Sequence, residues 1–306
     1  MTVPTTILGQ NQYGKAENRV IKITRDGATH HIKDLNVSVA LSGDLDEVHY
    51  SGSNANVLPT DTTKNTVFAF AKEQGIESAE QFGLALARHF VDATEPIRTA
   101  RIRIEEYAWE RIATSEGEAP HSFARRGQET RTAEVTYDGS TVQVLSGLKG
   151  LTVLNSTGSE FWGYIKDKYT TLKEDYDRIL ATEVSAVWRH GWSGEDDAAA
   201  PGWNTSYAAT KELMLRAFAE TYSLSLQQTL YAMGSQVLEG RLELEEIRFS
   251  MPNKHHFKVD LEPFGLKNEA ADGAVYIAAD RPYGLIEATV LREGAEARIP
   301  VDLTNL

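Results

Sequence analysis

The chain has 306 residues, of which 41% are hydrophobic, enough apolar material for one large folded domain or two. Its formal net charge of −13 at pH 7 argues against nucleic acid and against an anionic membrane surface as partners. The sequence contains no cysteine, which excludes disulfides, thiolate nucleophiles, iron–sulfur clusters and cysteine-based zinc sites.

The sequence shows no recognisable targeting signal. Residues 1–15 lack the basic segment and long apolar run of a secretory signal, and no apolar run approaches the length of a membrane span. The last three residues differ from the peroxisomal tripeptide Ser-Lys-Leu. We therefore expect a cytoplasmic protein.

The first elements along the chain are predicted to be a β-hairpin and a helix. Apolar and polar residues alternate over residues 35–41, which is the period of a half-buried strand, and Asp26 with Gly27 makes a favourable tight turn. A helix is predicted over residues 60–74, with Thr60 or Asp61 as its cap.

A second helix and a strand complete this first group. Ser78 and Gln81 form an S-x-x-Q capping box at the start of a helix predicted over residues 78–93. Residues 98–112 are predicted to form one strand.

The same order of elements then recurs. A second hairpin is predicted around Asp138 and Gly139, followed by helices over residues 210–220 and 225–240. Residues 244–259 are predicted to form a strand.

The two groups have a constant offset. Ser225 lies 147 residues after Ser78, and Arg248 lies the same distance after Arg101. We interpret this as an internal duplication of β-β-α-α-β-β units. The first repeat is placed at residues 12–125 and the second at 126–300, with an insertion at about 146–204.

The predicted fold class is α+β, with each unit an antiparallel sheet that carries its helices on one face. Such sheets have exposed edges, which invite pairing with another chain, and symmetric assembly is the usual remedy. We therefore expect an oligomer.

The segment "MPNKHHF" (251–257) raises the question of a metal site. In an extended backbone Asn253 and His255 point to the same side, and His256 points to the other. No zinc-type spacing of histidines or carboxylates surrounds them, so a metal site is not predicted. The segment considered by itself leaves two interpretations open: a polar strand end with a satisfied histidine, or a catalytic histidine.

Three further residues have both a functional and a plain interpretation. Gln227, near a helix N-terminus, could hold a planar anion or could simply start the helix. Arg178 could grip a planar acceptor edge, or could form a surface ion pair with Asp175 or Asp177. Phe161 could stack on a heterocycle, or could pack against its neighbour Trp162.

Thr60 and Lys15 are candidates for proton transfer. The Thr60 hydroxyl could relay a proton if a base lies within hydrogen-bond reach. A lysine acts as a base near neutral pH only where its surroundings favour the neutral amine, and Lys15 could equally lie in a solvated loop. No P-loop, G-x-G-x-x-G or G-x-S-x-G fingerprint is present.

Six segments taken together resemble one family. They are "YGK" (13–15), "PTDTTKNT" (59–66), "SGLKGLTVLNSTGSEFWGY" (146–164), "YTTLKEDYDRIL" (169–180), "SLQQTLYAMG" (225–234) and "MPNKHHF" (251–257). In this combination and order they resemble urate oxidase (uricase), from about Tyr13 to Val290.

The resemblance implies the tunnelling fold, with two repeats per chain and a homotetramer around a central tunnel. It also implies oxidation of urate by O₂ and water to 5-hydroxyisourate and hydrogen peroxide, in purine degradation, without a cofactor or a metal.

The resemblance also implies a proton-transfer group. Its members fall on Lys15, Thr60 and His255 of this sequence, and Asp61 adds a substrate contact through its backbone. The family's site lies between subunits, so Lys15 and Thr60 are expected from one chain and the substrate-binding residues from its neighbour.

The substrate-binding residues follow by the same resemblance. Phe161 matches the stacking aromatic, and Arg178 and Gln227 match the two clamps on the purine. Leu226 matches a backbone contact, and Asn253 matches the amide that faces the oxygen site.

Two positions need a choice between neighbours. "SLQQ" offers Gln227 and Gln228, and the spacing to the following Thr-Leu-Tyr favours Gln227. His256 falls where relatives also carry an aromatic residue, which favours His255 as the functional histidine.

Two other functions are considered beside urate oxidation. Other tunnelling-fold enzymes act on pterins, some with zinc at clustered histidines, and this sequence lacks such a cluster. A purine-binding protein without activity would need Phe161, Arg178 and Gln227 but would not need Lys15, Thr60 and His255 together.

Overall fold

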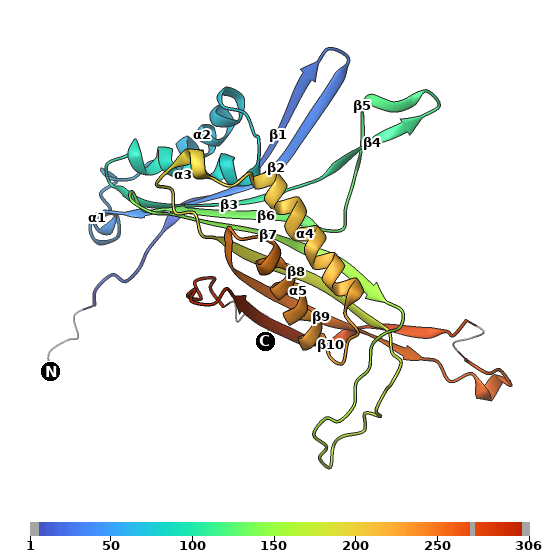
Figure 1. Ribbon diagram of the computed structural model, residues 1–306. Helices are drawn as coiled ribbons and strands as arrows, with labels where there is room; N and C mark the ends of the chain where they lie inside the picture. The colour runs from blue at the N-terminus through green and yellow to red at the C-terminus, as the bar shows by residue number, and fades with distance from the viewer. Residues whose placement is uncertain (1–5, 270–272, 302–306) are drawn as a thin grey trace, which may run out of the picture. The chain divides into compact units, whose positions relative to one another are not determined.

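The computed structural model describes residues 6–269 and 273–301, whose helices and strands are labelled in Figure 1. The chain divides into two compact units. Of the described residues, 6–147 and 189–205 belong to the first unit, and 148–188, 206–269 and 273–301 belong to the second. Strands β7 (Val142–Asn155) and β8 (Leu180–His190) each contribute to both units.

The first unit is built on four long strands in the order β1-β2-β3-β6, followed by the first residues of β7. These four strands pair antiparallel with their neighbours, and their bounds are β1 Tyr13–Asp26, β2 Thr29–Gly43, β3 Ile97–Glu106 and β6 Thr130–Tyr137. The predicted first hairpin is confirmed, because Asp26 pairs with Thr29 around the Gly27 turn.

Two helices pack on the strands of this first sheet. Helix α2 (Thr60–Glu73) packs on β1, and α3 (Ala79–Asp92) packs on β3 and β6 (Figure 1). A short helix α1 (Asp46–Tyr50) precedes them. The Ser78 cap is confirmed, since its Oγ accepts a hydrogen bond from Gln81 N at 3.1 Å. The core between sheet and helices is apolar, with residues such as Leu35, Phe82 and Ile102 fully buried.

The strand predicted over residues 98–112 is interrupted, and this part of the prediction was wrong. β3 ends at Glu106, and β4 (Trp109–Thr114) pairs instead with β5 (Gly117–Arg125) in a separate two-stranded sheet. Tyr107 N donates to Asp34 O at the break. Trp109 then donates its indole N–H to the buried Asp34 carboxylate at 3.0 Å, so the chain turns where side chains anchor it.

The second unit contains strands in the order β7-β8-β9-β10, with antiparallel pairing of β9 (Leu244–Lys258) and β10 (Tyr276–Leu291). Helix α5 (Leu226–Gly240) packs on β9 and β10 (Figure 1), and α4 (Trp203–Glu220) buries Met214 and Phe218 in the same core. Two short 3₁₀ turns are η1 (Asp197–Ala199) and η2 (Glu262–Phe264).

The residues expected as an insertion, 146–204, hold most of β7, a long loop over 156–179 and all of β8. Strand β7 carries the buried residues Leu148 and Leu151, and β8 carries the buried Trp188. The boundaries of the two repeats stay a prediction.

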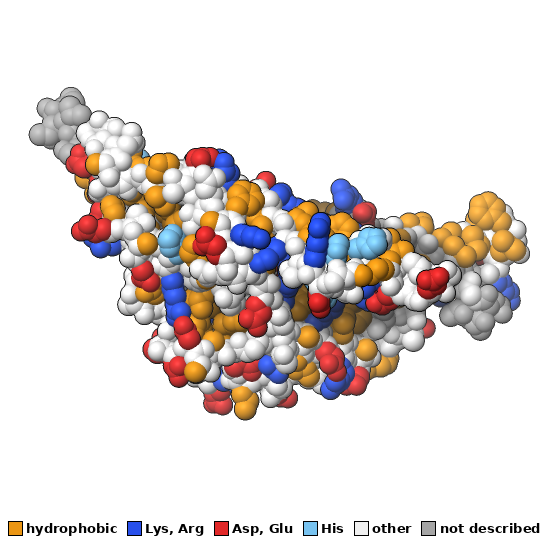
Figure 2. Space-filling model, turned by 90° about the horizontal axis from the view of Figure 1, so that it is seen from above, with side chains coloured by type: hydrophobic (Ala, Val, Ile, Leu, Met, Phe, Trp, Pro, Cys, Tyr) orange, Lys and Arg blue, Asp and Glu red, His pale blue; other side chains and the backbone are white. Residues whose placement is uncertain are grey.

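On the face shown in Figure 2, acidic side chains are scattered and Lys and Arg occur singly or in small groups. Among the described residues, no helix combines the length and the apolar character that crossing a membrane would require.

Candidate active site

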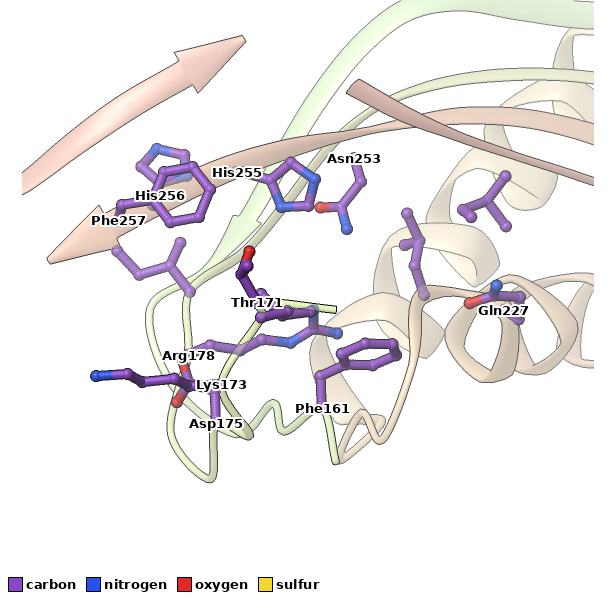
Figure 3. Close-up of a pocket in the computed structure, with 14 residues that line it drawn as sticks. Phe161, Thr171, Lys173, Asp175, Arg178, Gln227, Asn253, His255, His256 and Phe257 are labelled. Atoms are coloured by element: carbon purple, nitrogen blue, oxygen red, sulfur yellow. The ribbon is translucent and has the colours of Figure 1, made fainter. Parts of the chain in front are cut away.

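A cavity of about 560 Å³ lies within the second unit (Figure 3). Its walls come from the loop between β7 and β8, from the start of α5, and from β9 and β10. The lining residues include six of the nine predicted site residues, which are Phe161, Arg178, Leu226, Gln227, Asn253 and His255. Residues far apart in the sequence therefore converge on one cavity.

Arg178 is half-buried at the cavity wall, and a hydrogen bond to Ser159 fixes the orientation of its guanidinium. Its Nε donates to Ser159 Oγ at 3.0 Å, and its Cζ lies 5.2 Å from the centre of the Phe161 ring. Burial lowers the pKa of the guanidinium, while the charge of Asp175 acts in the opposite direction. In the part of the chain that the structure describes, no carboxylate lies within salt-bridge distance of Arg178, so the ion pair considered with Asp175 or Asp177 does not form.

Phe161 is held by its main chain. Its N–H donates to Asp175 O at 2.7 Å, and Asp175 N donates back to Phe161 O at 3.0 Å. The Phe161 ring stacks on Tyr164, with centroids 5.0 Å apart, whereas Trp162 stacks on Tyr176. The alternative in which Phe161 packs against Trp162 is therefore not what the structure shows.

The start of α5 separates the roles of the two adjacent glutamines. Ser225 Oγ accepts from Gln228 N at 3.2 Å, which confirms Ser225 as the helix cap. Gln228 Oε1 accepts from Leu224 N at 2.8 Å, one residue before the N–H that a capping box would use. The Gln228 side chain is thereby occupied, and Gln227 lines the cavity. The N–H groups of this first turn also supply partial positive charge.

His255 and Asn253 lie on β9, across the cavity from Arg178 (Figure 3). Burial lowers the pKa of His255, and the neighbouring charges of Arg178 and His256 lower it further. The His255 imidazole is therefore held in its neutral form near pH 7, when it can both donate and accept one hydrogen bond.

His256 has a different environment. It also borders the cavity, but its Nδ1 lies 3.0 Å from Lys254 O on its own strand. Within residues 6–269 and 273–301, no group of three or more His, Asp or Glu side chains is arranged to hold a metal ion.

The other three predicted residues belong to the first unit and do not line this cavity. Lys15 lies on β1, and Thr60 and Asp61 open α2. Thr60 was predicted to cap α2, and this prediction was wrong. Pro59 occupies the N-cap position, and no side chain caps the helix. The first N–H groups of α2 therefore have no side-chain acceptor at the cap position.

Lys15 and the start of α2 are close to one another. The Tyr13 hydroxyl accepts from Leu58 N at 2.8 Å and donates to Leu58 O at 3.0 Å. The pKa of Asp61 is lowered chiefly by its hydrogen bond to Lys64, and the charge of Lys15 contributes as well. The carboxylate of Asp61 is engaged with Lys64 and Asn65, which leaves its main chain for any further contact.

A β-bulge follows Lys15 directly. The β1–β2 register shifts between Lys15 and Asn18, and Glu17 adopts a positive φ of 56°. The buried Asn18 amide donates to Lys15 O at 3.3 Å and to Val37 O at 2.8 Å. Bulges and strained residues of this kind redirect neighbouring side chains and cluster at functional sites.

Several cavity residues were not predicted from the sequence: Thr171, Leu172, Lys173, Asp175, Ile179, His256, Phe257 and Ile286. Most belong to the loop over 156–179 or to strand ends, where no periodic pattern marks an inward-facing side chain. Ser159, the fully buried residue behind Arg178, was also missed. Its only sequence signal is its place two residues before Phe161.

The comparison with known proteins agrees with the geometry. The family model described as Uricase matches residues 11–136 and 144–287. The chain is 50% identical to the uricase of Arthrobacter globiformis over 295 residues, covering 96% of this chain and 93% of that one. The chain belongs to the uricase family. It is a urate oxidase, the enzyme that this family name denotes, and its place is in purine catabolism.

Other members of the uricase family support the same assignment. The uricase of Aspergillus flavus is 36% identical over 295 residues, covering 94% of this chain and 98% of that one. The crystal structure of the Arthrobacter globiformis uricase superposes with a TM-score of 0.89 at 49% identity, covering 97% of this chain and 99% of that one. The predicted α+β class with an antiparallel sheet and helices is thereby confirmed.

Proposed function

We propose that this urate oxidase converts urate, O₂ and water to 5-hydroxyisourate and hydrogen peroxide without a cofactor, at the cavity of the second unit. Two electrons pass from urate to O₂, which leaves as hydrogen peroxide, and water adds to the oxidised ring. The convergence of Phe161, Arg178, Gln227, Asn253 and His255 on one cavity is the observation that carries the proposal.

The substrate is held as a planar anion. Arg178 and Gln227 come from opposite sides of the cavity and can pair with two edges of one flat ring (Figure 3). Phe161 supplies a stacking face beside them. Because no carboxylate forms a salt bridge with Arg178 among the described residues, its charge is available to the urate anion.

The oxygen side of the reaction is assigned to Asn253 and Thr60. The Asn253 amide faces the cavity from β9 and can hold first O₂ or peroxide and then the attacking water. The Thr60 hydroxyl, which does not cap α2, can complete this position and pass a proton to Lys15. His255, kept neutral by its surroundings, can orient Lys15. Leu226 and Asp61 are assigned main-chain contacts to the purine.

The active site is proposed to form between subunits of a homotetramer. The cavity contains the substrate clamps, the oxygen-facing amide and the histidine, but neither Lys15 nor Thr60 lines it. The Tyr13–Leu58 contact groups Lys15 with Thr60, so the first unit presents a separate catalytic half. A neighbouring copy would supply that half to the cavity, as in the family that the sequence resembles.

Oxygen uptake coupled to urate loss tests the proposed reaction. Purified protein is treated with a chelator, and the ultraviolet absorbance of urate is followed together with the oxygen concentration. Equal molar loss of urate and O₂ is expected. Bound urate with no turnover would instead favour a purine-binding protein, and activity that returns only with added metal would contradict cofactor-free oxidation.

A further inference from the structure

Three buried hydroxyl groups lie next to the segments that carry the substrate clamps. Ser159, Ser223 and Thr229 are all fully buried in the second unit, although none of them lines the cavity. Burying a hydroxyl is unfavourable unless it is hydrogen-bonded, so three such groups together need an explanation.

Ser159 contacts Arg178 through both its main chain and its side chain. Arg178 N donates to Ser159 O at 2.9 Å, and Arg178 Nε donates to Ser159 Oγ at 3.0 Å. A guanidinium is a rigid planar fork, so two contacts from one residue fix both the position of the arginine backbone and the rotation of the guanidinium plane.

Ser159 is in turn joined to the segment that leads into α5. Glu160 N donates to Ser223 O at 2.8 Å, and Ser223 N donates to Gly158 O at 2.9 Å, which makes a short parallel bridge. Thr229 Oγ1 donates to Ser223 Oγ at 2.8 Å. Ser223 Oγ donates to the carbonyl of the helix cap two residues later, at 3.0 Å. The loop that carries Arg178 is thus coupled to the first turn of the helix that carries the second clamp.

We propose that Ser159 is a positioning residue for urate binding, acting through Arg178. By occupying Nε, Ser159 leaves the two terminal nitrogens of Arg178 to receive the acceptor edge of the purine. The half-buried guanidinium then needs no carboxylate to hold it in place, so its charge remains available to the substrate. This inference rests on the proposed role of Arg178 as a substrate clamp.

Steady-state kinetics of Ser159→Ala test the inference. The KM for urate is expected to rise about tenfold, with kcat changed less than about threefold, because the lost bond is to a charged group that acts mainly in binding. Ser206→Ala is the matched control. Ser206 is a buried serine of the same unit whose Oγ donates to Glu243 at 2.8 Å, and it does not line the cavity. Its KM should match that of the wild type.

A double-mutant cycle separates positioning from general destabilisation. In an Arg178→Ala background, Ser159→Ala should change KM by less than about twofold, because the residue through which it acts is absent. A tenfold effect that persists in that background would overturn the proposal, as would an unchanged KM in the single variant.

Two further outcomes remain distinguishable. If Arg178→Ala itself leaves KM unchanged, then the proposed clamp fails, and the inference fails with it. If Ser159→Ala does not fold, as judged by thermal melting, Ser159→Cys keeps the side-chain shape while weakening the acceptor, and the same tenfold rise is expected.

Discussion

The hydroxyl of Tyr13 makes two hydrogen bonds to one residue, accepting from Leu58 N and donating to Leu58 O. Burial raises the pKa of the Tyr13 phenol, although the bond to Leu58 acts the other way, so the hydroxyl stays protonated and can donate. Through this contact the strand that carries Lys15 is joined to the residues immediately before Thr60. The proposed base and its relay are therefore positioned as one element.

Removing this hydroxyl should impair turnover rather than substrate binding. Tyr13→Phe is expected to lower kcat about tenfold, since loss of one or two hydrogen bonds lets Lys15 and Thr60 move apart. The KM for urate should change little, because the clamps lie in the second unit. Steady-state kinetics check this, with Tyr107→Phe as control, whose hydroxyl donates to Glu105 elsewhere in the first unit. Equal effects of the two variants would argue against a positioning role for Tyr13.

Lys15 itself should be needed for chemistry and not for binding. Lys15→Met keeps the length of the side chain and removes the amine, so kcat is expected to fall at least about a hundredfold, the lower range for loss of general acid–base catalysis. Urate should still bind, as measured by equilibrium dialysis under anaerobic conditions. A variant with unchanged turnover would remove Lys15 from the mechanism.

The lowered pKa of His255 should make the folded protein less stable at acidic pH. Its pKa lies below the usual value of 6.5, so between the two values the unfolded state binds more protons than the folded state. Stability contributed by the neutral imidazole is present above pH 6.5 and is lost as pH falls through this window. His255→Gln should therefore show a flatter pH dependence of unfolding free energy than the wild type. Parallel curves in denaturant titrations at several pH values would contradict this.

An anion bound beside Arg178 should reverse part of the lowering of the His255 pKa. Because Arg178 is one cause of the lowered pKa, a negatively charged urate analogue against the guanidinium should raise the pKa of His255. NMR titration of the histidine ring protons, with and without an analogue that the enzyme does not oxidise, measures the change. A pKa that is insensitive to the analogue would place the anion away from Arg178.

Local sequence patterns predicted the regular elements well where their signal was strong. The Ser78 and Ser225 helix caps, the Gly27 hairpin and the long strand that carries His255 all have the expected local geometry. The interruption after Glu106 was missed because the strand pattern continues through Trp109, and only the buried Asp34, distant in sequence, explains the turn.

The site was harder to predict from the residues alone. Arg178 and Gln227 are ordinary residues in isolation, and only the fold brings them to one cavity. The resemblance to a family supplied their roles, but it did not indicate Ser159, whose proposed role depends on its two hydrogen bonds with Arg178 in three dimensions. Thr60 was predicted as a cap because its residue type favours that position, yet Pro59 occupies it.

The central claim is that two catalytic halves, one around Lys15 and Thr60 and one around Arg178, meet in a site formed by two copies of the chain. Mixing Lys15→Met and Arg178→Ala subunits, by co-expression or by refolding together, tests this most directly, because each variant by itself is expected to be nearly inactive at low urate. With random assembly and isologous contacts, about one quarter of the sites would combine two intact halves, so about a quarter of wild-type activity should return. Mixed protein that stays as inactive as its parents would show that both halves must come from the same chain, and would contradict the account.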